Sequence, residues 1–126
     1  MCQKQFGSFF YALVTAPNDG LEWTRGEPTY FQSSVNIDRG FCRNCGTPMT
    51  YRHPGGLELA IGTFDERIDL QPQIQVNHEA RLPWVEKIFD APVHTDPDFY
   101  SRQEAIISFQ HPDHDTETWP AKGFKA

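Results

Sequence analysis

The sequence lacks long hydrophobic runs, has few basic residues and contains only three cysteines among its 126 residues. Its longest apolar run, from Phe9 to Val14, covers six residues, whereas a membrane-spanning helix needs about 20. Lysine and arginine number 11 against 17 aspartates and glutamates, which leaves a formal charge of −6. Binding to nucleic acid needs clustered cations that contact phosphates, and this chain has no such cluster. We therefore expect no membrane association and no nucleic-acid partner.

The small, odd number of cysteines also limits the cellular setting. Three thiols cannot all pair with one another, and small secreted domains held by disulfides carry more cysteines in even numbers. Lys4 and the apolar residues that follow it resemble a signal peptide only weakly, because polar residues interrupt its start and no small-x-small motif precedes Pro17. We expect a reducing, cytoplasmic location.

The chain contains enough apolar residues for one core, with 38% hydrophobic residues that include 10 Phe, 4 Tyr and 3 Trp. A chain of this length is expected to form one domain that buries about two-thirds of its unfolded surface. Strand-like runs separated by turn residues recur roughly every 8–12 residues, which is typical of antiparallel β proteins. These runs cover residues 9–15, 21–25, 29–37, 49–52 and 57–63, and a further alternating pattern begins at Ile74 and Val76. The sequence therefore predicts an all-β, antiparallel fold.

One helix is predicted in the C-terminal part, over residues 97–110. Phe99, Ile106 and Ile107 can share one face of it, and Asp96 or Asp98 can cap its start. Residues 111–126 are predicted to form an irregular tail.

The segment with the clearest chemical meaning is Cys42-Arg43-Asn44-Cys45-Gly46. A C-x-x-C pair in a tight turn directs two sulfurs at one ion, and the following glycine permits a positive φ. Half of a tetrahedral zinc site is the direct interpretation. A redox pair and two unligated thiols are the alternatives, although a redox pair is expected at the start of a helix in a βαβ unit.

A complete tetrahedral zinc site needs two further ligands, which the sequence does not clearly supply. Cys2 is one candidate. The five histidines are other candidates. His111 and His114 have the H-x-x-H spacing of a pair of zinc ligands, although Pro112 between them disfavours a rigid arrangement of the two side chains. The candidate metal ligands are therefore Cys42, Cys45 and Cys2, in a zinc site that we expect to be incomplete in this chain.

Five blocks of sequence occur in a recognisable order. They are Met1-Cys2-Gln3-Lys4, Trp23-Thr24-Arg25-Gly26-Glu27-Pro28, Arg39-Gly40-Phe41-Cys42-Arg43-Asn44-Cys45-Gly46-Thr47-Pro48, Gly62-Thr63-Phe64-Asp65 and Arg81-Leu82-Pro83-Trp84. Together they resemble the glutathione-dependent formaldehyde-activating enzyme (GFA) family, which includes the centromere protein V domain, over about residues 1–92. Residues 93–126 lie outside the resemblance, so we expect a GFA-like β domain at 1–92 and a C-terminal extension at 93–126.

The resemblance implies a tent-like antiparallel β fold with two zinc sites. In that family an N-terminal C-x-C pair and the later C-x-x-C pair hold a structural zinc, and Cys42 with Cys45 match the later pair. A C-x-C-x-x-C cluster holds the proposed catalytic zinc and leaves a position for a thiol substrate, and Cys2 matches its last cysteine. The remaining family cysteines have no counterpart here. Either the start lies at an internal methionine or the chain is a shortened, metal-poor relative, and the family-like stretch at the very start favours the first.

The function implied is a zinc-dependent carbon–sulfur lyase that acts on thiol–aldehyde adducts of the S-hydroxymethylglutathione type, impaired by the missing ligands. The alternative is a non-catalytic, metal-poor β domain that binds a small molecule or a protein. We expect a small-molecule thiol or aldehyde as substrate, with Lys4, Arg43 or Arg52 as candidate contacts for its carboxylates, and assign no catalytic residue. We also expect a homodimer, because a sheet without its leading strands exposes an edge that can pair with another chain.

Overall fold

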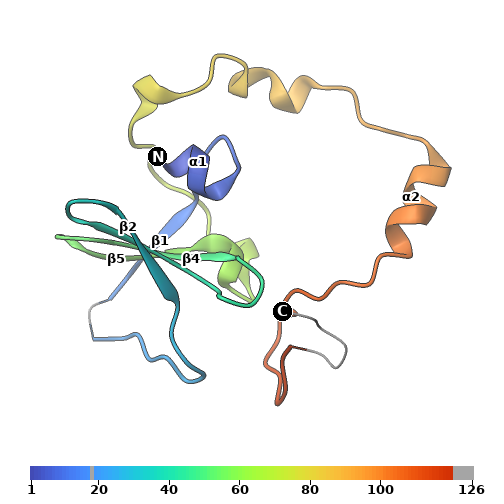
Figure 1. Cartoon of the computed structure of the whole chain (residues 1–126). Coiled ribbons are helices and arrows are strands. Elements are labelled where there is room, and N and C mark those ends of the chain that lie inside the picture. Colours follow the sequence, from blue (N-terminus) through green and yellow to red (C-terminus); the bar gives the residue numbers. More distant parts are fainter. Residues whose placement is uncertain (18, 121–126) are drawn as a thin grey trace.

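The computed structural model describes residues 1–17 and 19–120, which form a mostly β fold with a helix near the C-terminus (Figure 1). This confirms the predicted fold class. Within these residues no helix is both long enough and apolar enough to cross a membrane. The elements are α1 (Cys2–Phe6), β1 (Leu13–Ala16), β2 (Thr29–Ser34), β3 (Ile37–Phe41), β4 (Pro48–His53), β5 (Gly56–Ala60), the 3₁₀ turns η1 (Ile61–Thr63), η2 (Arg67–Asp69), η3 (His78–Ala80) and η4 (Val85–Asp90), and α2 (Pro97–Glu104).

The five strands form one antiparallel sheet in the order β1-β5-β4-β3-β2. Strands β2 to β5 follow one another as a meander, and β1 joins it by pairing Leu13–Ala16 with Ala60–Leu57. The register places Arg39 of β3 opposite Phe31 on one side and Tyr51 on the other. Because β1 and β2 are the outer strands, each has one edge without a strand partner in the described part of the chain.

The predicted strands agree best with the structure in the meander. The predicted run at 29–37 covers β2, the turn after it and the first residue of β3, which continues to Phe41. Residues 49–52 lie in β4, and the run at 57–63 forms β5 and the turn η1. Three predictions were wrong: residues 9–12 are not in a strand, residues 21–25 form none, and the pattern at Ile74 and Val76 is exposed and unpaired. The predicted helix is shorter than expected and ends at Glu104.

The N-terminal helix α1 was not predicted from the sequence. It ends at Phe6 and is capped by Gly7, whose φ of 64° places it in the left-handed region and whose N–H donates to the Gln3 carbonyl. Such a glycine cap satisfies a carbonyl that the helix would otherwise leave unpaired. The segment that joins α1 to β1 is held by side-chain packing and not by strand pairing. The centres of the Phe6 and Tyr11 rings lie 4.1 Å apart.

The centre of the sheet is tightly packed around Gly40 and Thr50. Thr50 is fully buried, and its Oγ1 accepts a hydrogen bond of 3.1 Å from the Gly40 N–H. A β-carbon at Gly40 would stand 2.9 Å from the β-carbon of Pro28, so only glycine fits at this position. The buried core is small, since Ala16 and Ala60 are the only buried hydrophobic residues among those described.

The total exposed area reflects this small core. The chain of 14.5 kDa exposes 10487 Å². A compact monomer of that mass exposes roughly 6,900 Å², and its unfolded chain roughly 21,000 Å². The chain therefore buries about half of its unfolded surface, and the expected two-thirds was wrong.

Replacing Thr50 by valine keeps the shape of the side chain but removes the acceptor for the Gly40 N–H. We expect Thr50→Val to lower the free energy of unfolding by about 1–3 kcal/mol, because a buried donor loses its partner. Thr15→Val, at an exposed position on β1, is the matched control and should change it by less than about 0.5 kcal/mol. Urea denaturation of both variants tests this, and equal stabilities would contradict it.

Candidate functional site

The turn between β3 and β4 brings two of the three cysteines together. The Cys42 N–H donates to the Thr47 carbonyl at 2.9 Å, and the Gly46 N–H donates to the Cys42 carbonyl at 2.8 Å. Gly46 has a φ of 77°, which a residue with a side chain rarely adopts. Cys42 and Cys45 are thus on one tight turn, as the C-x-x-C spacing predicts, and both thiols are partly exposed.

The environment of Cys45 favours its thiolate. Partial burial raises the pKa of the Cys45 thiol, but hydrogen bonds from the Thr47 side chain and backbone, together with one from Cys42, outweigh it and lower the pKa. The Thr47 hydroxyl lies 3.0 Å from the Cys45 sulfur and 3.1 Å from Gln110 Oε1. Since this hydroxyl has one proton, it donates to the sulfur when Cys45 is ionised.

Removing the Thr47 hydroxyl should therefore raise the pKa of Cys45. We expect Thr47→Val to shift the pH midpoint of Cys45 alkylation upward, because burial then opposes ionisation with less compensation. Alkylation rates resolved by mass spectrometry measure this for each thiol separately. Thr29→Val, an exposed threonine on β2, should leave the midpoint unchanged. An unchanged midpoint in Thr47→Val would show that the hydroxyl does not act on the sulfur.

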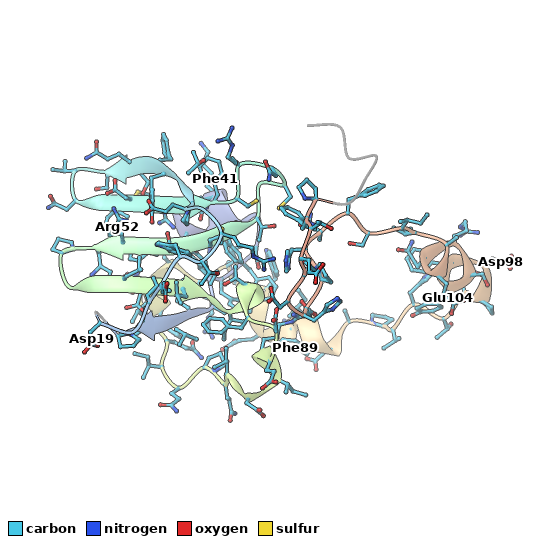
Figure 2. All side chains as sticks on the ribbon, turned by 90° about the horizontal axis from the view of Figure 1, so that it is seen from below. Asp19, Phe41, Arg52, Phe89, Asp98 and Glu104 are labelled. Carbon is cyan, nitrogen blue, oxygen red and sulfur yellow. The ribbon has the colours of Figure 1, made fainter. Side chains whose placement is uncertain are left out.

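The C-terminal tail packs beside this turn, close to the end of β3 at Phe41 (Figure 2). Besides the contact between Gln110 and Thr47, two ion pairs of 2.7 Å attach it to the body. They join Arg67 to Asp113 and Arg25 to Asp115, and because all four side chains are largely exposed each pair contributes little stability. A cavity of about 1090 Å³ lies between the turn, residues 22–28, residues 62–67 and the tail.

The third cysteine lies elsewhere, next to a buried arginine. Cys2 is in α1, and its sulfur accepts a hydrogen bond of 3.3 Å from Nη2 of Arg39. Arg39 is only 1% exposed and also donates to Gln5 Oε1 at 3.4 Å and to Ser33 Oγ at 3.0 Å. Its guanidinium lies 4.9 Å from the centre of the Tyr51 ring. Among the described residues no carboxylate pairs with this buried cation.

A buried tyrosine hydroxyl completes this second cluster. The Tyr11 hydroxyl is buried without a hydrogen-bond partner, and the Arg39 guanidinium lies 5.9 Å from the centre of the Tyr11 ring. Burial raises the pKa of Tyr11 to about 12; the charge of Arg39 opposes this rise and that of Cys2 adds to it. The hydroxyl therefore stays protonated at neutral pH and contributes only an unsatisfied polar group.

Removing that hydroxyl should not cost stability. We expect Tyr11→Phe to leave the free energy of unfolding unchanged or to raise it by about 1 kcal/mol, because a buried polar atom without a partner is unfavourable. Tyr100→Phe is the control, since the exposed Tyr100 hydroxyl donates to the His94 carbonyl. Thermal denaturation measures both, and a loss of more than about 1 kcal/mol in Tyr11→Phe would indicate a hydrogen bond to this hydroxyl.

The described residues do not complete a zinc site. Cys42 and Cys45 offer two thiols, but residues 1–17 and 19–120 contain no group of three His, Cys, Asp or Glu side chains that could hold a metal ion. Cys2 therefore does not join the turn. His111 packs against the ring of Trp119, and His53 lies 3.4 Å from Glu58. The ligand set of Cys2, Cys42 and Cys45 remains a prediction.

The basic residues suggested for substrate carboxylates lie in different places. Arg43 lines the cavity beside the turn, whereas Arg52 stacks on the ring of Tyr30 at 4.2 Å and Lys4 belongs to α1. Sequence reasoning missed the role of Arg39. The signal was present, since Arg39 shares a strand face with Ile37 and Phe41, where an apolar residue is expected.

The comparisons with known proteins agree with the resemblance noted in the sequence. The sequence model of the glutathione-dependent formaldehyde-activating enzyme family, GFA, matches residues 1–80, which is more than half of the chain. The chain belongs to this family. Comparisons with curated proteins and with solved structures found no match. In this GFA chain the matched region contains all five strands and all three cysteines, whereas α2 and the tail beside the cavity lie outside it.

Proposed function

We propose that the chain is a carbon–sulfur lyase of the GFA type that acts on adducts of a small thiol and an aldehyde. The observation that supports this most is the family match over residues 1–80, which includes the turn with Cys42 and Cys45. The family name refers to glutathione as the thiol and to formaldehyde as the aldehyde. An adduct of these two, of the S-hydroxymethylglutathione type, is the proposed substrate.

The proposed reaction forms or breaks one bond between sulfur and carbon. In the forward direction the thiol sulfur attacks the carbonyl carbon, and the proton of the thiol ends on the former carbonyl oxygen. In reverse, the carbon–sulfur bond breaks and the proton returns to sulfur. No redox partner is needed, because the aldehyde carbon and the sulfur keep their combined oxidation state.

The cavity beside the turn is the proposed place for the thiol substrate. Its lining includes Arg25, Arg43 and Arg67, and arginine side chains suit the carboxylates of a molecule such as glutathione. Tail carboxylates already pair with Arg25 and Arg67, so Arg43 is the proposed first contact for an incoming carboxylate.

The proposal includes two zinc sites. Cys42 and Cys45 would contribute two ligands to one site, and Cys2 would contribute one ligand to the other. The described residues by themselves complete neither of these sites. That same observation favours the second candidate function, a non-catalytic β domain that binds a small molecule or a protein.

Two measurements on the purified chain separate these functions. Exchange NMR with glutathione and formaldehyde should show adduct formation faster than in buffer, and elemental analysis should detect zinc. Arg43→Gln should raise KM for glutathione about tenfold, which corresponds to one charge-assisted hydrogen bond, and leave KM for the uncharged thiol 2-mercaptoethanol unchanged. Arg52→Gln is the matched control and should change neither KM, because Arg52 is exposed on β4 and lies outside the cavity lining. Exchange no faster than in buffer, with no zinc bound, would support the non-catalytic function.

A further inference from the structure

The exposed area of the chain is larger than that of a compact monomer by enough to form an interface. The difference between the observed 10487 Å² and the expected area is roughly 3,600 Å². A stable dimer of ordinary size covers about 800 Å² on each partner, and an obligate homodimer covers more. The excess therefore exceeds what a dimer of this chain requires.

Of the 17 large hydrophobic residues that are exposed in the described chain, eight lie in one segment, residues 85–109, which we call the arch. Every residue from 91 to 110 is exposed, so neither face of α2 is buried. Large apolar side chains are frequent in it, and monomeric proteins rarely expose so many together. They are Ile88, Phe89, Val93, Phe99, Tyr100, Ile106, Ile107 and Phe109, of which Phe89 is 86%, Val93 79% and Ile107 79% exposed.

Both ends of the arch are attached to the body, and the arch itself extends away from it. At the first end the centre of the Trp84 ring lies 5.9 Å from that of Phe9, and at the second Gln110 Oε1 lies 3.1 Å from the Thr47 hydroxyl. Between them the chain runs out to α2 and back (Figure 1), and Asp98 and Glu104 lie far from the strands (Figure 2). The arch therefore does not use the sheet of its own chain to cover its apolar side chains.

We propose that the arch is the homodimer interface, in which the arch of one chain packs against that of a second copy around a two-fold axis. Such a contact uses the same surface twice and must be self-complementary. The arch can meet this condition, because its apolar side chains can pack on their copies across the axis and its two basic residues, Lys87 and Arg102, can each face one of its five acidic residues. This inference does not depend on the proposed enzymatic function.

Analytical ultracentrifugation of the 126-residue chain tests the proposal. The wild-type chain should sediment as a dimer of twice 14.5 kDa. Ile107→Glu should weaken dimerisation about a hundredfold, because the two-fold axis places two new charges in one apolar contact. Phe89→Ser, in the other limb of the arch, should also weaken it. Val35→Glu is the matched control, since Val35 is 85% exposed in the turn between β2 and β3, and it should leave the dimer intact.

Three results would overturn the proposal. One is a monomeric wild-type chain at every concentration. The second is a dimer that both arch variants retain. The third is a dimer lost in Phe31→Glu but not in Ile107→Glu, since this would place the interface at the free edge of β2. Because the substituted side chains in the arch are exposed, circular dichroism should show every arch variant folded like the wild type.

Discussion

The buried guanidinium of Arg39 is the interaction on which the arrangement of this chain depends. Burying a cation is costly unless its donors are satisfied, and here its three hydrogen bonds reach two elements other than its own strand. Cys2 and Gln5 hold it from α1, and Ser33 holds it from β2. In a domain with so small an apolar core, this polar cluster attaches the N-terminal helix to the sheet.

The same contact separates the thiols into two environments. Arg39 holds Cys2 at the face of the sheet, while Cys42 begins the turn that follows the same strand. Cys45 has donors that favour its thiolate and a cavity beside it, whereas Cys2 has a buried cation and an unsatisfied tyrosine hydroxyl nearby. The described chain therefore contains two distinct thiol sites and not one cluster of three.

Sequence reasoning succeeded where structure is decided locally. The turn of Cys42 and Cys45 follows from C-x-x-C-G spacing, and the meander follows from strand runs separated by turn residues. It failed where distant contacts decide. Helix α1 has only five residues and depends on the Gly7 cap and on Arg39, and Ile74 with Val76 has the alternation of a strand but no strand beside it. Arg39 was overlooked because its partners lie more than thirty residues away in the sequence at Gln5 and Cys2.

The separation of the thiols can be measured directly with a short bifunctional alkylating reagent, followed by peptide mass spectrometry of the metal-free, reduced chain. A reagent that spans two neighbouring thiols should link Cys42 to Cys45, because both lie on one turn, and should modify Cys2 at one end only. Links from Cys2 to Cys42 or Cys45, formed as readily as the link within the turn, would show that all three thiols share one site and would contradict the role given to Arg39.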